Sequence, residues 1–92
     1  MPLDSAQKKK LKQAAHHLKP LIRVGQKGMT DSLVTETDAC IERHELIKVH
    51  VAAGERDERS ALATELATKI GADLVHSIGK VFILYRKKKD EA

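Results

Sequence analysis

The sequence predicts one small mixed α/β domain whose elements follow the order α-β-α-β-α-β-β around a four-stranded mixed sheet. Helical periodicity alternates along the chain with short β-branched runs, and strands joined through helices are expected to run parallel. The last two strand segments are separated only by Gly79-Lys80, which predicts an antiparallel hairpin. The 92 residues are 41% apolar and 33% charged, which suits a single globular core rather than a disordered chain. We place this domain at about residues 5–86 and expect a flexible tail at 87–92.

The first helix is expected to be capped by Asp4 or Ser5 and to stop before Pro20. An apolar stripe repeats along it at helical spacing and consists of Leu11, Ala14, Ala15 and Leu18. A second stripe on the same helix is basic and consists of Lys8, Lys12 and His16, with Lys19 one turn further on. Residues 21–24 then predict a short strand that ends at Gly25.

The middle of the chain predicts a second helix, capped by Thr30 or Asp31, and a strand over residues 46–51. The inner positions of this helix are Leu33, Val34, Thr37, Cys40 and Ile41. Alternation in the strand places Ile47, Val49 and Val51 on one face. A third helix is expected to be capped by Asp57 and to end at Gly71, with inner positions Leu62, Ala63, Leu66, Ala67 and Ile70. Residues 72–78 and 81–86 are the strands of the hairpin.

Charge is distributed unevenly along the chain. Residues 1–30 hold seven Lys or Arg and one acid, residues 31–66 hold four bases and nine acids, and residues 67–92 hold six bases and three acids. The net charge is only +4, but from residue 5 to residue 30 there is no acidic residue. A one-sided basic segment of this kind predicts a basic face and a polyanionic partner.

The loop Gly25-Gln26-Lys27-Gly28 is the sharpest functional feature of the sequence. Its two glycines bracket a strand-to-helix turn, where the backbone can take a positive φ and a ligand can approach without a Cβ in the way. Loop amides, the start of the next helix and Lys27 could together meet a phosphate. A Gly-x-x-Gly loop clamps the nucleic-acid backbone in KH domains. By itself the four-residue pattern favours a tight turn with a solvated lysine. The basic charge of the first thirty residues makes RNA binding the better interpretation.

The predicted RNA-binding residues combine this loop with the basic side chains near it. They are Gly25, Gln26, Lys27, Gly28, Arg23, Lys19, Lys12, Lys9, Lys8, His16 and Lys48. Phe82 and Tyr85 are expected on opposite faces of the last strand, so the chain cannot form a multi-aromatic stacking platform. Binding is therefore expected to rest on phosphate contacts and shape, and to depend strongly on salt.

Other classes of protein find little support. Cys40 is the single cysteine, which excludes an internal disulfide and suits a reducing compartment. Cys40 with His44, and His16 with His17, lack the spacing of known metal motifs, and no nucleophile–base pair stands out. The N-terminus lacks the pattern of a secretory signal, and no apolar run could span a membrane. We expect a cytoplasmic monomer, not an enzyme, with no cofactor, metal, membrane or small-molecule substrate.

Three motifs in this order resemble the CRM domain (chloroplast RNA splicing and ribosome maturation), in its free-standing bacterial, YhbY-like form. They are residues 16–30 (HHLKPLIRVGQKGMT), residues 44–49 (HELIKV), and Ile78-Gly79-Lys80 leading to Leu84-Tyr85-Arg86. The resemblance covers residues 5–86. It implies a fold like the C-terminal domain of translation initiation factor three with an added N-terminal helix, and association with precursors of the large ribosomal subunit. It also implies that the loop 25–28 contacts RNA together with neighbouring basic residues.

Two alternatives remain at this point. The acidic middle segment, which includes Glu36, Asp38 and Glu42, could make the chain a protein-interaction module that docks ribosomal or assembly proteins. The histidines could in principle serve a metal-dependent nuclease. RNase-resistant partners would favour the first alternative, and bound metal with RNA cleavage the second.

Overall fold

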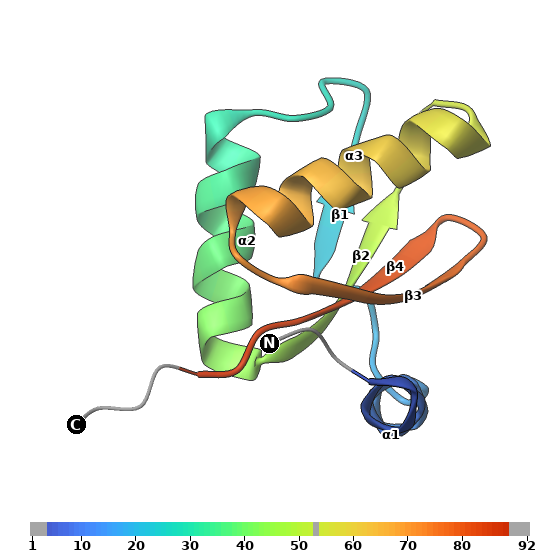
Figure 1. The fold of residues 1–92 in the computed structure, drawn as a ribbon. Helices are drawn as coiled ribbons and strands as arrows, with labels where there is room; N and C mark the ends of the chain where they lie inside the picture. The colour runs from blue at the N-terminus through green and yellow to red at the C-terminus, as the bar shows by residue number, and fades with distance from the viewer. Residues whose placement is uncertain (1–3, 53, 89–92) are drawn as a thin grey trace.

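The computed structural model describes residues 4–52 and 54–88, and these form three helices and four strands (Figure 1). The elements are α1 (Ser5–Ala15), β1 (Ile22–Val24), α2 (Asp31–His44), β2 (Leu46–Val51), α3 (Arg56–Lys69), β3 (Asp73–Ile78) and β4 (Val81–Tyr85). This is the predicted order. The tail expected to be flexible lies, from residue 89 onwards, outside the described residues. Within them, no helix combines the length and apolar character that a membrane crossing requires.

The sheet has the strand order β1-β2-β4-β3. β1 pairs with β2 in parallel, and β4 pairs antiparallel with both β2 and β3. The crossover through α3 therefore returns the chain parallel to β2, but one position away, and β4 fills the space between. This arrangement confirms the predicted four-stranded mixed sheet, and Gly79-Lys80 form the hairpin turn, with Gly79 at a φ of 59°.

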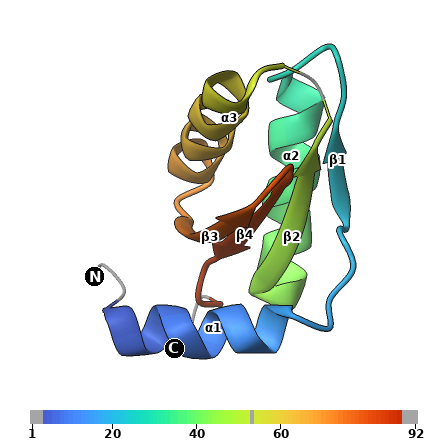
Figure 2. The same cartoon turned by 90° about the vertical axis from the view of Figure 1, so that its right-hand side faces the viewer.

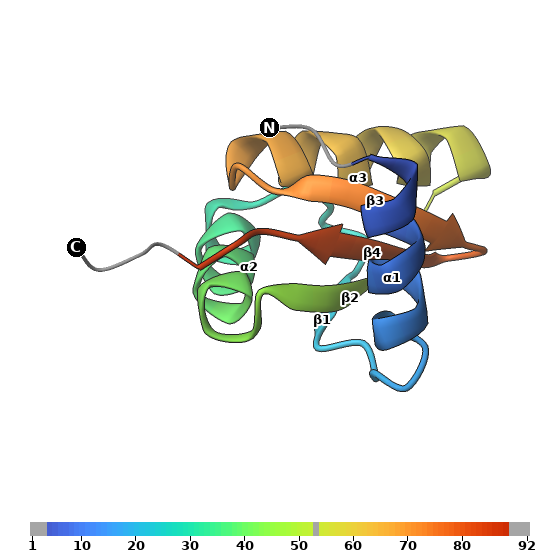
Figure 3. The ribbon, with the colours of Figure 1, turned by 60° about the horizontal axis from the view of Figure 1, so that its bottom comes forward.

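Helices cover both faces of the sheet, as Figures 2 and 3 show from two directions. α2 and α3 pack on one face, where Ile47, Val49 and Val51 of β2 are fully buried as predicted. α1 crosses the other face in contact with β2, β3 and β4. There Ala15 packs with Val75 and Ile83 in a second, smaller cluster. Phe82 belongs to the first cluster and Tyr85 flanks the second, so these two aromatic side chains do lie on opposite faces.

The first helix ends earlier than its sequence pattern predicts. Asp4 caps it, because the Asp4 carboxylate accepts a hydrogen bond from the Gln7 N–H (2.8 Å) and the Gln7 side chain accepts one from the Asp4 N–H (3.0 Å). The last residue is Ala15, and Leu18 lies in the following turn with 38% of its surface exposed. Ala14 is exposed as well. Leu11 and Ala15 therefore form the inner stripe, and its expected extension to Leu18 is wrong, because the chain must leave the helix to reach β1.

The other helix ends follow local capping chemistry. Thr30 caps α2, as one of the two predicted candidates, with its hydroxyl accepting from the Leu33 N–H at 3.0 Å. The N-cap of α3 is Glu55 and not the predicted Asp57. Glu58 lies three residues after Glu55 and reaches back to its N–H, at 3.4 Å, which starts the helix two residues early. Gly71 follows α3 at a φ of 67°, as predicted for a glycine that ends a helix.

Candidate nucleic-acid interface

Gly25-Gln26-Lys27-Gly28 forms a tight turn between β1 and α2. The Gly28 N–H donates a hydrogen bond to the Gly25 carbonyl at 3.1 Å, and this bond closes the turn. Gln26 and Lys27 are exposed at its tip. Gly28 has a φ of 65°, which disfavours every residue with a Cβ, whereas Gly25 has no positive φ. A Cβ built on Gly25 would meet no described atom within 4 Å. Gly28 thus shapes the turn, and Gly25 leaves its surface open.

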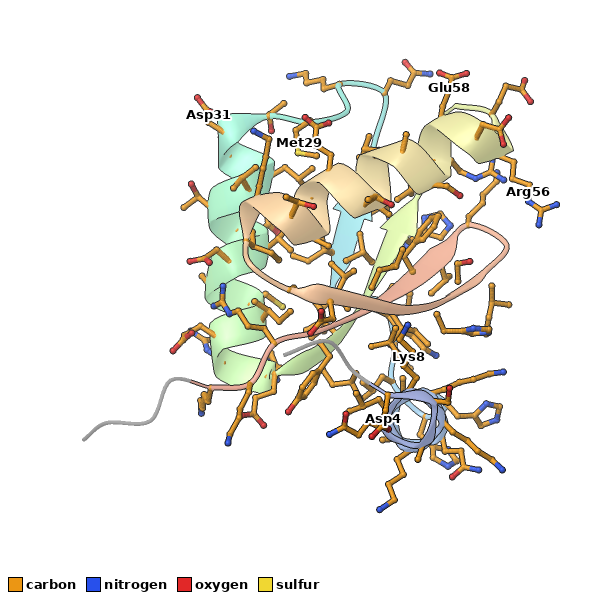
Figure 4. The ribbon with its side chains drawn as sticks, viewed as in Figure 1. Asp4, Lys8, Met29, Asp31, Arg56 and Glu58 are labelled. Carbon is orange, nitrogen blue, oxygen red and sulfur yellow. The ribbon has the colours of Figure 1, made fainter. Side chains whose placement is uncertain are left out.

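Neighbouring elements hold this loop in place. Met29 packs as a half-buried side chain against the main core, between α2 and α3 (Figure 4). A Cβ on Gly28 would lie 3.8 Å from the Leu62 side chain of α3, so α3 directly supports the turn. The Ala52 N–H donates to the Val24 carbonyl at 2.9 Å, which ties the end of β2 to the end of β1. The loops that follow these two parallel strands therefore share one edge of the sheet, where ligands bind in many α/β proteins.

The start of α2 offers less to an anion than the sequence suggests. Thr30 already occupies the Leu33 N–H, and Asp31 places an exposed carboxylate in the first turn of the helix (Figure 4). A negative side chain at this position interacts with the helix dipole itself and repels a second anion. Lys27 and the open backbone at Gly25 are therefore the parts of the turn best suited to a phosphate.

The basic residues lie in three places instead of one patch. Lys8, Lys9, Lys12 and His16 are all exposed on α1 or at its end, and α1 and the loop 25–28 occupy opposite ends of the molecule (Figures 1 and 2). The uneven charge predicts one basic face, whereas the structure places the basic residues of α1 away from the loop 25–28. The first thirty residues are contiguous in sequence, but β1 carries the chain from one end of the domain to the other.

Arg23 and Lys48 lie between these two ends. Burial of Ile22 and Val24 under α2 turns Arg23 to the opposite face, and burial of Ile47 and Val49 does the same for Lys48. Arg23 pairs in register with His50 on the neighbouring strand. We call Lys8, Lys9, Lys12, His16, Lys19, Arg23 and Lys48 the basic tract. Its members lie on α1 and at its end, in the segment between α1 and β1, and on the α1 side of β1 and β2.

His16, His17 and Cys40 are candidate metal ligands in the sequence. The rings of His16 and His17 meet edge to face, with their centroids 5.3 Å apart. Burial raises the pKa of the Cys40 thiol on α2 above its ordinary value. Over residues 4–52 and 54–88, no group of three His, Cys, Asp or Glu side chains is placed to hold a metal ion.

Comparison with known proteins identifies the family. The model of the CRS1 / YhbY (CRM) domain matches residues 3–86. This chain belongs to the CRS1 / YhbY (CRM) domain family. The resemblance inferred from the three motifs is thereby confirmed.

Relatives of this CRM domain cover nearly its whole length. Probable RNA-binding protein PA4753 of Pseudomonas aeruginosa is 46% identical over 87 residues, which make up 95% of this chain and 84% of the relative. An RNA-binding protein of Haemophilus influenzae is 34% identical over 88 residues, 96% of this chain and 89% of the relative. The solution structure of a Staphylococcus aureus protein superposes with a TM-score of 0.85 at 32% identity, and covers 99% of this chain and 95% of its own. The last match confirms the fold.

Arg86, the last residue of the third CRM motif, has a structural role that the sequence does not reveal. Its guanidinium donates to Asp38 Oδ1 at 2.6 Å, to Glu42 Oε2 at 2.8 Å and to the Ile70 carbonyl at 2.7 Å. The hydrogen bond with Asp38 is the main reason why the pKa of Arg86 is raised. Asp38 and Glu42, two acids of the acidic middle segment, thus form ion pairs with Arg86 within the domain. Arg86 fastens the end of β4 to α2 and to the end of α3.

Proposed function

We propose that this CRM domain is a non-enzymatic RNA-binding factor that associates with ribosomal RNA in precursors of the large ribosomal subunit. It would act in the cytoplasm as a monomer. The observation that carries the proposal is the exposed turn Gly25-Gln26-Lys27-Gly28. A backbone hydrogen bond closes this turn at one edge of the sheet, and the space above Gly25 is open. The relatives from Pseudomonas aeruginosa and Haemophilus influenzae are named as RNA-binding proteins, which supports RNA binding. The link to the large subunit follows from the CRM resemblance.

Contacts to the RNA backbone supply the affinity in this proposal. The Lys27 ammonium group pairs with a phosphate, and the phosphate approaches closely because Gly25 has no side chain. The basic tract adds further phosphate contacts along the sheet. Phe82 is 2% exposed and Tyr85 packs beside α1, so neither of these aromatic rings is presented as a stacking surface. Recognition therefore depends on the shape and charge of the RNA more than on its base sequence.

Substitution of Lys27 tests the loop directly. Lys27 is exposed and forms no ion pair within the described part of the chain, so Lys27→Glu should leave the unfolding midpoint unchanged. Its affinity for a large-subunit ribosomal RNA fragment should fall about tenfold, which corresponds to about 1.4 kcal/mol. Lys69→Glu at the far end of α3 carries the same change of charge and serves as the control. Unchanged affinity in Lys27→Glu would refute the role of the loop.

The ribosomal part of the proposal needs a test in cells. Ultraviolet crosslinking followed by sequencing of the bound RNA should recover large-subunit ribosomal RNA, enriched in precursor particles over mature subunits. Crosslinks confined to messenger or transfer RNA would contradict the ribosomal assignment while leaving RNA binding intact. The ion pairs of Asp38 and Glu42 with Arg86 weaken the alternative of a protein-docking module, because these two acids of the acidic segment already have a partner within the domain.

A further inference from the structure

A polar pocket of about 390 Å³ opens between the start of α3 and the tip of the β3–β4 hairpin. It is lined by Arg56, Arg59, Ser60, Ser77, Gly79 and Phe82. Ser77 and Phe82 face each other across β3 and β4, on the side of the sheet that α3 covers. The lining thus combines two arginines and two hydroxyl groups with one buried aromatic ring. None of these residues belongs to the loop 25–28 or to the basic tract.

The pocket follows from the way α3 packs on the sheet. The second half of α3 buries Ala63, Leu66 and Ala67, whereas most of its first turns are exposed and polar. Figure 1 shows the hairpin tip extending beneath these first turns. Since Arg56, Arg59 and Ser60 stand where an apolar helix face would pack, the space between helix and hairpin remains open and polar.

Among the described residues, one N–H group of Arg59 lacks a hydrogen-bond acceptor. One of its terminal nitrogens donates to the Gly54 carbonyl at 2.8 Å, which holds the side chain in place. Its Nε atom is buried and has no partner among the described residues. A buried N–H without an acceptor is unfavourable, and folded proteins rarely leave one unpaired. An oxyanion in the pocket would supply acceptors to Arg59 and to the two serine hydroxyls together.

The nearby carboxylates do not occupy this pocket. Glu58 turns back to the helix start, where it accepts from the Glu55 N–H. Figure 4 shows Glu58 and Arg56 on opposite sides of α3, with Arg56 on the side of the hairpin. Glu55, Asp57 and Glu58 are all absent from the lining of the pocket, which therefore presents positive charge and hydroxyl donors.

We propose that this pocket binds a phosphate group of the RNA, as a second backbone contact beyond the glycine loop. The inference rests on the proposed function. Arginine pairs with phosphate through two parallel N–H···O bonds, and the serine hydroxyls can donate to the remaining oxygens. The pocket and the loop share α3, because Leu62 supports Gly28 and Arg59 lies one turn before it. An RNA strand that leaves the loop across the first turns of α3 reaches the pocket.

A titration with inorganic phosphate tests the pocket without RNA. In amide spectra of the full chain, the signals of Ser60, Ser77 and Gly79 should shift and saturate. Arg56→Ala should weaken this binding at least threefold, whereas Arg43→Ala on the exposed part of α2 should not change it. Arg56 is exposed, so its substitution should leave the fold intact. Shifts that do not saturate, or that Arg56→Ala leaves unaltered, would overturn the proposal.

A second arm uses single-stranded RNA and separates the pocket from the loop. Arg56→Ala and Ser77→Asp should each lower RNA affinity three- to tenfold, and Arg56→Ala should reduce the slope of log affinity against log salt by about 0.7. If Lys27→Glu weakens binding and the two pocket variants match the wild type, the pocket proposal fails and the loop assignment stands. If the wild-type chain binds phosphate in the pocket but no RNA, both the RNA assignment of the pocket and the proposed function fail.

Discussion

The two glycines of the loop should respond to alanine in opposite ways, because one shapes the turn and the other leaves it open. Gly28→Ala should destabilise the domain and change RNA binding only slightly. Gly25→Ala should leave the fold intact and weaken RNA binding. The pair therefore separates a structural glycine from a functional one within four residues.

The size of each stability effect follows from the local geometry. At Gly28 the left-handed φ of 65° costs a residue with a Cβ about 1–2 kcal/mol. The Leu62 contact at 3.8 Å adds no clash, and alanine recovers about 0.4–1 kcal/mol by restricting the unfolded chain. The net loss is about 1 kcal/mol, or about 4–8 °C in the unfolding midpoint of a domain this size. Gly25 has no positive φ and open space where a Cβ would lie, so the free energy of unfolding of Gly25→Ala should equal or slightly exceed that of the wild type.

The effect on RNA binding comes from space at the surface. The methyl group of Gly25→Ala would project where the phosphate approaches, and we expect a loss of at least fivefold in affinity, about 1 kcal/mol. Thermal unfolding by circular dichroism and fluorescence anisotropy with a labelled ribosomal RNA fragment measure the two quantities. Wild-type affinity in Gly25→Ala would refute close phosphate approach at this position. A larger loss of stability in Gly25→Ala than in Gly28→Ala would refute the assignment of roles.

Three further predictions concern the rest of the domain. Arg86→Ala should lower the free energy of unfolding, measured in urea, by about 2 kcal/mol. This value is kept modest because Asp38 and Glu42 are about half exposed and solvent screens their charges. A loss below about 0.5 kcal/mol would contradict a structural role. Since burial raises the pKa of Cys40, its thiol should react with a disulfide reagent at pH 8 more slowly in the folded than in the urea-unfolded chain, and equal rates would exclude this protection. Asp4→Ala removes the cap of α1 and should speed hydrogen exchange of the α1 amides about fivefold, equivalent to about 1 kcal/mol. The amides of the sheet should exchange at the wild-type rate. Equal acceleration of all amides would show that α1 does not open independently.

Features that depend on neighbouring residues could be predicted from the sequence. Thr30 caps α2, Gly71 ends α3, and β2 alternates between buried and half-buried positions over the predicted residues 46–51. These features arise from backbone hydrogen bonds and side-chain direction over a few residues, so the local pattern contains the information. The shift of the α3 cap from Asp57 to Glu55 shows the limit of that reasoning, because two overlapping local signals compete and Glu58 decides between them.

The candidate site also has one part that the local sequence predicts and other parts that depend on the tertiary structure. The two glycines of the sequence predict the turn at residues 25–28, which has a closing hydrogen bond and a positive φ at Gly28, whereas its support by Leu62 of α3 is a tertiary contact. The distance of α1 from this loop, the pairing of Arg86 with Asp38 and Glu42, and the pocket between α3 and the β3–β4 hairpin are set only by the tertiary structure. Each of these joins segments that are far apart in the chain. Their positions depend on which sheet face each helix buries, and this packing is a property of the whole core.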